Sequence, residues 1–328
     1  MIDKDFPLYI LTFALTFVLT VLCERLLIPI LKGKAKQPIY DEGPRWHLSK
    51  TGTPTMGGLA FLIGVTVSLV IASLPLILRE EHENVISLYL CLGYSVLNSL
   101  IGILDDVCKL KKRENMGLSA LQKILLQSLV AVLFLAGRTL YIKDATNLSF
   151  SFGSYDIGWL YYPLGLFLLL GITNCANLTD GIDGLAGGVA FSVGVSIFYL
   201  SCALSTEVSL ISSAIIGATS GFLIFNLHPA KIFMGDTGSL FLGSLVVSSI
   251  FSLGNPLLSV PIGAVYVIEG VSVVLQVLFY KATKKRLFKM APLHHHLERC
   301  DWTENRICIV GMIVTFLMSI PAYILYLP

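Results

Sequence analysis

The stretch that decides the fold reads FPLYILTFALTFVLTVLC and runs from Phe6 to Cys23 without an Asp, Glu, Lys or Arg. Built as an α-helix it would be about 27 Å long, close to the roughly 30 Å hydrocarbon core of a bilayer. Such a segment indicates a membrane-spanning helix. Six longer stretches lack the same four residue types: Thr51–Leu78, Asn84–Leu104, Ile157–Thr179, Gly184–Thr206, Val208–Ala230 and Ile307–Pro328.

The remaining apolar sequence predicts three more helices, which brings the total to ten. Thr237–Ile268 is too long for one helix and contains the triplet Gly254-Asn255-Pro256, so we expect one helix to end there and another to run from about residue 257 to 280. Leu118–Gly137 predicts a further span, with Lys123 near its start. We therefore expect an all-α polytopic membrane protein in which residues 1–328 form a single integral membrane domain.

The composition supports a membrane protein. Only 13% of the 328 residues are charged, against roughly 25% in a typical soluble domain, and 55% are hydrophobic. The chain is apolar, with a mean hydropathy of +0.79 and a net charge of +2, which excludes intrinsic disorder. The isoelectric point near 8.1 is too low for a nucleic-acid-binding domain.

The basic residues predict how the helices are oriented. If loops are numbered from the first helix, the odd-numbered loops hold sixteen Lys and Arg, whereas the N-terminus and the even-numbered loops hold four. Basic loops stay in the cytoplasm, so we expect both termini on the outer side. An outer loop alternates apolar and polar residues before Gly153-Ser154, which predicts a small β-hairpin near residues 148–157. The odd-numbered loops are 32–53, 105–117, 173–183, 227–237 and 281–304.

Carboxylates collect at the predicted cytoplasmic ends of the helices. Asp105 and Asp106 follow the third apolar stretch, and we expect them to close that helix. Charge at membrane depth is costly and marks functional sites. The outer side has only scattered charges, so we expect any chemistry at the cytoplasmic surface. The same surface holds Asp180, Asp183, Asp236, His294–His296, Lys50, Lys109, Lys111, Lys112 and Arg113.

Each of these features also has a structural interpretation. The run Lys111-Lys112-Arg113 is typical of an anchor to anionic lipid headgroups. The carboxylates of the later loops are flanked by glycines, so either a turn or close backbone approach to a phosphate explains them. For Asp105 and Asp106 a structural role is weaker, because the C-terminal end of a helix disfavours anions.

Together the five carboxylates predict a divalent cation, because their own motifs contain no matching cations. Oxygen ligands favour Mg²⁺ or Mn²⁺ over softer metals. Lys, Arg and His on the same surface indicate an anion bridged by the metal, which is typical of a phosphate or diphosphate site. A cytoplasmic nucleoside diphosphate that meets a lipid phosphate fits this position. The sequence has no Walker A or dinucleotide-binding glycine motif, so the nucleotide would be a substrate.

Five motifs occur in order along nearly the whole chain: KTGTPTMGG (50–58), Asp105-Asp106, NLTDGIDGLA (177–186), FMGDTGS (233–239) and APLHHHLE (291–298). They resemble the motifs of the phospho-N-acetylmuramoyl-pentapeptide transferases, a branch of the polyprenyl-phosphate N-acetylhexosamine-1-phosphate transferase superfamily. The wider superfamily shares the Asp motifs, whereas the first and last motifs point to the muramoyl-pentapeptide branch.

The resemblance implies a reaction and a location. Phospho-N-acetylmuramoyl-pentapeptide would pass from its UDP-activated precursor to undecaprenyl phosphate, which gives lipid I and UMP in peptidoglycan synthesis. The enzyme would require Mg²⁺ and lie in the bacterial inner (cytoplasmic) membrane, with its active site on the cytoplasmic face. Such proteins have a strongly bent ninth helix, which fits Pro256, Pro261 and Gly263, and are commonly homodimers.

The resemblance and the residue chemistry together suggest catalytic roles. We expect Asp236 to bind Mg²⁺, with Asp105 and Asp106 as further candidate ligands. One of those two would act as general base for the lipid phosphate; the alternative is a nucleophile that forms an aspartyl-phosphate. His295 is the fourth candidate catalytic residue.

The substrate-binding candidates surround these groups. Phe233 would stack on uracil in a uridine pocket, and the His triplet would bind the diphosphate or the sugar. Glu269 and Gln276 would line a lipid groove, with a hydrogen-bonded structural role as the alternative for Glu269. The substrate-binding candidates are Lys50, Thr55, Lys109, Lys123, Asn177, Asp180, Asp183, Phe233, His294 and His296.

Two other functions compete with this one. A related transferase would move GlcNAc-1-phosphate from UDP-GlcNAc onto the same lipid carrier. A secondary transporter would also have ten helices and buried acids, but transporter acids usually lie near the middle of the bilayer within broken helices. The carboxylates here collect at one face, which favours an enzyme.

Overall fold

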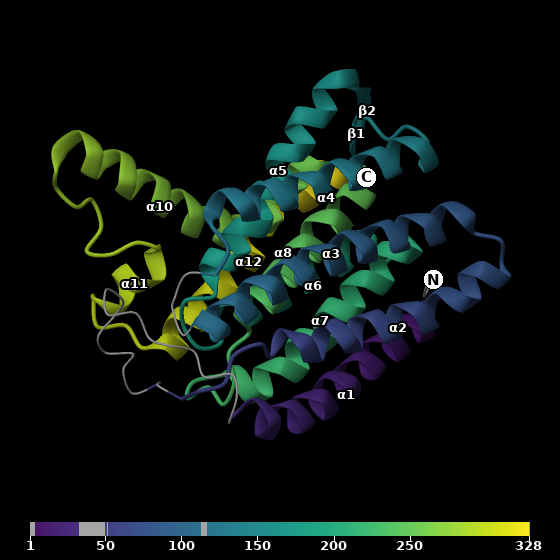
Figure 1. Cartoon of the computed structure of the whole chain (residues 1–328). Helices are drawn as coiled ribbons and strands as arrows, with labels where there is room; N and C mark the ends of the chain where they lie inside the picture. Colours follow the sequence, from purple (N-terminus) through teal and green to yellow (C-terminus); the bar gives the residue numbers. More distant parts are fainter. Residues whose placement is uncertain (1–3, 33–49, 51, 113–116, 328) are drawn as a thin grey trace.

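The computed structural model describes residues 4–32, 50, 52–112 and 117–327, and this part of the chain is mainly α-helical with one small sheet (Figure 1). The longer helices are α1 (Phe6–Leu31), α2 (Gly58–Leu78), α3 (His82–Lys112), α4 (Ala120–Tyr141), α5 (Tyr161–Thr179), α6 (Leu185–Ser201), α7 (Thr206–Asn226), α8 (Gly235–Ser252), α10 (Ala264–Thr283) and α12 (Glu304–Tyr326). The short elements are β1 (Asn147–Phe150), β2 (Gly153–Asp156), η2 (Gly158–Leu160), η3 (Pro256–Leu258), α9 (Ser259–Ile262) and α11 (Leu293–Glu298).

Eight helices of the described chain are long and apolar enough to cross a membrane, which confirms a polytopic membrane protein. The two other bundle helices are α6, which is apolar but has 17 residues, and α8, which has 18. Both are almost entirely buried by their neighbours. These two helices account for the difference from the ten spans that the sequence predicts.

Helix α8 forms the centre of the bundle and packs against α2, α3, α5 and α7. Its sequence contains five serines and three glycines, and such small residues allow helices to approach closely. One very close approach is at Gly102 of α3, where a Cβ atom would overlap the backbone of Asp236. A larger residue at Gly102 would therefore push α3 away from the first turn of α8.

The predicted hairpin is confirmed and lies at the far end of α8. β1 and β2 pair antiparallel, with Asn147 opposite Asp156. The Ser149 N–H donates to Gly254 O at 2.9 Å, just beyond the last turn of α8. An 18-residue helix is about 27 Å long, so the hairpin and Asp236 mark opposite ends of the bundle.

The end of α3 differs from the sequence-based expectation. Asp105 and Asp106 do not close the third helix, because α3 continues to Lys112. The ion pair of Lys109 with Asp105, four residues earlier, stabilises this extra turn. The side chain of Lys112 and residue Arg113 lie outside the described residues.

The predicted ninth helix is interrupted near its start, which agrees with the bend that the family resemblance implied. The chain forms the short helices η3 and α9, the helical structure is interrupted at Gly263, and α10 begins at Ala264. In Figure 1, α10 leans away from the bundle and leads to α11. This places the histidine motif beside the end of the bundle that carries Asp236.

Candidate active site

The first turn of α8 is held by a carboxylate from α3. Asp106 accepts hydrogen bonds from the backbone N–H and Oγ1 of Thr237, at 2.9 and 2.7 Å, and from the Asp236 N–H at 3.2 Å. These N–H groups belong to the helix N-terminus and have no partner within the helix. Asp106 therefore caps α8, and the same contact orients Asp236.

Three carboxylates and two ammonium groups meet at this point. Lys109 Nζ lies 2.7 Å from Asp105 and 3.2 Å from Asp236, and Lys123 Nζ lies 3.1 Å from Asp105 and 2.5 Å from Asp236. The sequence predicted all five residues, but it offered no pairing between them. The Asp motifs themselves contain no matching cation, but the fold brings Lys109 and Lys123 from outside the motifs to these carboxylates.

The connection from α3 to α4 is fixed to the same cluster. Asp105 Oδ1 accepts a hydrogen bond from the Leu118 N–H at 2.7 Å. Ser119 then caps α4 in a reciprocal box with Gln122, so α4 begins at Ala120 and presents Lys123 in its first turn. This local geometry explains how a lysine at the start of a membrane helix reaches two aspartates.

The three carboxylates of this cluster could hold a metal ion. Oxygens of Asp105, Asp106 and Asp236 lie within 4.8 Å of one another, and hard oxygen ligands suit Mg²⁺. The side chains of Asp105 and Asp106 are 0% and 4% exposed, whereas that of Asp236 is 14% exposed. The oxygens of Asp106 already accept three hydrogen bonds, and Asp236 is the most exposed of the three carboxylates. A metal ion at Asp236 would share its oxygens with Lys109 and Lys123.

The motif at 50–58 lies directly beside this turn, although Thr51 is outside the described residues. Gly57 and Gly58 donate backbone hydrogen bonds to Phe233 O and Met234 O, at 2.9 and 3.0 Å. The Phe233 N–H donates to Pro54 O at 2.8 Å. These bonds hold the half-buried Phe233 ring and the buried Thr55 near the start of α8.

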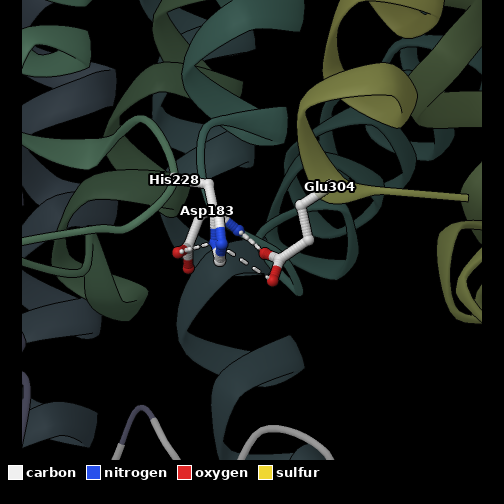
Figure 2. Close-up of side chains that lie close together, drawn as sticks. All are labelled: Asp183, His228 and Glu304. Carbon is white, nitrogen blue, oxygen red and sulfur yellow. Dashed lines mark hydrogen bonds and ion pairs between the residues drawn. The ribbon is translucent and has the colours of Figure 1, made fainter.

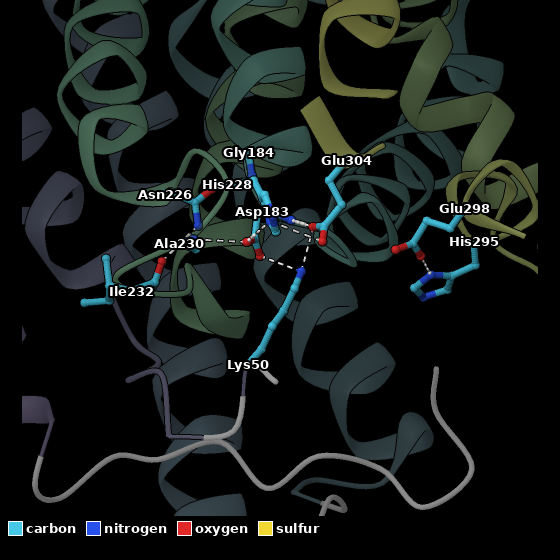
Figure 3. A network of polar contacts seen from close by, with 10 residues as sticks. All are labelled: Lys50, Asp183, Gly184, Asn226, His228, Ala230, Ile232, His295, Glu298 and Glu304. Atoms are coloured by element: carbon cyan, nitrogen blue, oxygen red, sulfur yellow. Dashed lines mark hydrogen bonds and ion pairs between the residues drawn. The ribbon is translucent and has the colours of Figure 1, made fainter. Parts of the chain in front are cut away.

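A second polar network joins four segments that are distant in sequence, and Figure 2 shows three of its side chains, Asp183, His228 and Glu304. Lys50 Nζ donates to Asp183 Oδ1 at 2.7 Å and to Glu304 Oε2 at 2.6 Å. His228 Nδ1 lies 2.9 Å from Asp183 Oδ2 and 3.4 Å from Glu304 Oε1. Figure 3 shows that these side chains converge from the start of α12, the loop after α7 and the loop after α5.

Asp180 lies at the end of α5, between the two networks. Burial, followed by the negative charges of Asp236, Asp106 and Asp183, raises the pKa of Asp180 to about 7. One turn earlier, Asn177 is half-buried and its backbone carbonyl accepts the Asp180 N–H at 3.1 Å. A group with this pKa changes charge near neutral pH, and carboxylates of both networks act on it.

The three histidines have different partners. His294 is fully buried with Nδ1 3.2 Å from Glu269 Oε2, and its ring lies against Gly181, where any Cβ would overlap it. His295 Nδ1 lies 2.6 Å from Glu298 Oε2. His296 Nδ1 accepts the backbone N–H of Lys289 at 3.1 Å.

Glu269 and Gln276 are held within the protein. Glu269 is 4% exposed and accepts the His294 N–H at 3.2 Å, which favours the structural alternative over a groove-lining role. Gln276 Oε1 accepts the backbone N–H groups of Leu287 and Phe288, at 3.1 and 2.9 Å, and so ties α10 to the segment that follows it.

Sequence reasoning missed several residues of the site. Thr237 was inside a quoted motif, and its position beside Asp236 at a helix start could have marked it as a bonding partner. Glu298 was also inside a quoted motif, APLHHHLE, three residues after His295. His228 and Glu304 lie outside the quoted motifs, and their roles depend on how distant loops meet.

The comparisons with known proteins agree with the geometry. The model of glycosyl transferase family 4 matches residues 87–254, and signature 1 of phospho-N-acetylmuramoyl-pentapeptide-transferase matches residues 50–62. Proteins of that name from Halalkalibacterium halodurans, Clostridioides difficile and Bacillus subtilis are 40%, 41% and 41% identical to this chain. The alignments cover 95%, 94% and 94% of this chain and 96%, 94% and 95% of the relatives. The chain belongs to the phospho-N-acetylmuramoyl-pentapeptide-transferase family.

Proposed function

We propose that this protein transfers phospho-N-acetylmuramoyl-pentapeptide from its UDP-activated donor to undecaprenyl phosphate, which gives lipid I and UMP in peptidoglycan synthesis. Relatives of that name cover nearly the whole chain. The observation that carries the chemistry is the cluster of Asp105, Asp106 and Asp236 with two lysines at the N-terminus of α8.

The reaction needs a charged phosphate to attack another charged phosphate. An oxygen of the lipid phosphate forms a bond to the donor phosphorus that carries the sugar, and the bond from that phosphorus to the UMP oxygen breaks. Lys109 and Lys123 supply positive charge next to the reacting groups, and the N-terminus of α8 adds a favourable dipole. Mg²⁺ held by Asp236 would neutralise charge on the diphosphate and stabilise the leaving UMP.

The contacts of the two buried aspartates favour direct attack. A nucleophilic Asp106 would have to give up its hydrogen bonds to Thr237, and a nucleophilic Asp105 would have to leave Lys109 and Lys123. The lipid phosphate is ionised near neutral pH and needs little help from a base. Asp105 and Asp106 therefore serve mainly to position the lysines and Asp236, with the covalent route as the alternative.

The donor would lie along the loops around this cluster. The uridine pocket consists of Phe233, which stacks on uracil, with Asn177 and Asp180 on its polar side. Lys50, Thr55 and Asp183 lie near this pocket. The sugar and the diphosphate would lie beside His295 and His296. His294 is buried, so it would support this part of the site without touching the substrate.

The same proposal includes the arrangement in the membrane. We place ten spans in the bacterial inner (cytoplasmic) membrane, with α6 and α8 as the two short central ones and both termini outside. The excess of Lys and Arg in the odd-numbered loops supports a cytoplasmic active site. A homodimer is part of the proposal by resemblance to the family.

One assay tests the proposal against its nearest rival. Purified protein is given undecaprenyl phosphate, Mg²⁺ and either UDP-N-acetylmuramoyl-pentapeptide or UDP-GlcNAc, and UMP release is measured. We expect UMP only with the muramoyl donor. UMP release from UDP-GlcNAc alone would assign the related GlcNAc-1-phosphate transfer instead, and no UMP from either donor would refute both.

A further inference from the structure

A groove of about 660 Å³ lies beside the proposed donor site and has no part in the transfer chemistry described above. One part of its lining is Glu298, whose carboxylate pairs with His295. Another part is His228 and Glu304, which belong to the network of Lys50 and Asp183. In Figure 3 the His295–Glu298 pair is drawn to the right of this network.

The groove carries both signs of charge and one aromatic side chain. Arg299 and Asp301 are exposed members of its lining, and Trp302 is half-buried. The guanidinium of Arg306 lies 4.0 Å from the Trp302 ring centroid. A volume of this size is in the range that binds extended organic ligands. The mixture suits a peptide, which offers amide groups, apolar side chains and charged ends.

A metal ion is a poorer fit to this region. Asp183, His228 and Glu304 have ligand atoms within 4.8 Å of one another. Lys50 Nζ already lies 2.7 Å from Asp183 and 2.6 Å from Glu304, so an ammonium group occupies the cation position. A divalent ion there would have to displace a lysine that is only 14% exposed.

We propose that this groove binds the peptide part of the sugar-peptide donor, an inference that rests on the proposed function. If the sugar lies at His295, a chain attached to the sugar leads past Glu298 into the groove. Arg299 and Asp301 then meet charged groups of the peptide, and Trp302 packs against one of its side chains. The groove thereby selects donors that carry a peptide.

Donors of different length test this assignment. UMP release is measured for the pentapeptide donor and for UDP-N-acetylmuramic acid without peptide, using wild type, Arg299→Gln and Trp302→Leu. We expect wild type to prefer the pentapeptide donor in kcat/KM by about tenfold or more, a range typical of anchor contacts. Both variants should lose most of this preference and keep the kcat/KM for the peptide-free donor. The control is Lys143→Gln, whose side chain is 87% exposed near the hairpin.

Either of two kinetic results would overturn the assignment: wild type that does not distinguish the two donors, or variants that lower kcat/KM for both donors by one factor. A binding measurement keeps the test independent of turnover. A Trp46→Phe, Trp159→Phe protein retains Trp302 as its single tryptophan. Free N-acetylmuramoyl-pentapeptide should change its fluorescence with saturation, whereas N-acetylmuramic acid and UDP should not. If no donor releases UMP, the proposed function is wrong. In that case, Trp302 fluorescence that does not change with the free pentapeptide ligand would also refute peptide binding in the groove. A saturable change would still support peptide binding there.

Discussion

The carboxylate of Asp106 accepts two hydrogen bonds from Thr237, one from its backbone N–H at 2.9 Å and one from its Oγ1 at 2.7 Å. Asp106 belongs to α3 and Thr237 to the first turn of α8, whose own cap residue, Met234, makes no side-chain capping bond. The cap of α8 is therefore supplied by another helix. The contact couples the placement of Asp236 to the packing of α3 on α8.

Replacing Asp106 by Ala should destabilise the protein and lower its activity together. The change removes a helix cap, which costs about 1–2 kcal/mol, and leaves buried N–H groups without an acceptor. We expect a lower unfolding temperature and a fall in kcat, because Asp236 is no longer oriented. Ser205→Ala is the matched control, since it removes the cap of α7 at the other end of the bundle. Equal activity losses in the two variants would contradict a positioning role.

Asp236→Asn should abolish turnover while the protein stays folded. The amide keeps the size of the side chain, and Lys109 and Lys123 retain Asp105 as a partner. Loss of one negative charge weakens the proposed Mg²⁺ site, so Mg²⁺ binding measured by calorimetry should weaken too. Asp144→Asn, an exposed carboxylate near the hairpin, should leave both unchanged. Full activity of Asp236→Asn with Mg²⁺ would refute the metal assignment.

Phe233→Ala should weaken binding of the uridine nucleotide by roughly 1–3 kcal/mol, the scale of stacking a base on an aromatic ring. The ring is half-buried, and the backbone on both sides is fixed by bonds to Pro54 and Gly57. Truncation should therefore remove the stacking surface without moving the loop. Phe233→Tyr, which keeps the ring, serves as the control. Unchanged UMP or UDP affinity in Phe233→Ala would show that the ring does not contact the base.

The sequence predicted most of the helices because charge-free stretches of 18 or more residues have few alternatives to a membrane span. It misplaced the end of α3, since the apolar pattern stops at Leu104. The helix continues because Lys109 pairs with Asp105, a contact that hydrophobicity does not report. Full spans at α6 and α8 stay a prediction, because these helices have 17 and 18 residues and are surrounded mainly by neighbouring helices.

For the site, the motifs predicted the three carboxylates of the α8 cluster, and the two lysines were predicted as phosphate-binding candidates outside the motifs. None of the distances between them followed from the sequence. Pairing of Lys50 with Glu304 joins residues 254 positions apart, and no local pattern reports such a contact. The His triplet shows the opposite limit. Three consecutive histidines suggested a single binding element. In the structure the side chain of His294 is buried beside Glu269, whereas that of His295 pairs with Glu298.

The pKa of Asp180 gives the protein a pH dependence whose sign can be derived. Burial and nearby carboxylates raise this pKa to about 7, whereas an Asp in an unfolded chain has a pKa of roughly 3.9. Between these values the folded protein holds a proton that the unfolded chain has released, so this group lowers stability as pH rises from about 4 to about 7. Asp180→Asn removes the ionisation. The gain in unfolding temperature of this variant over wild type, measured without divalent cations, should therefore be larger at pH 8 than at pH 5. Asp144→Asn should show no such pH dependence, and a gain in Asp180→Asn that is the same at both pH values would contradict the raised pKa.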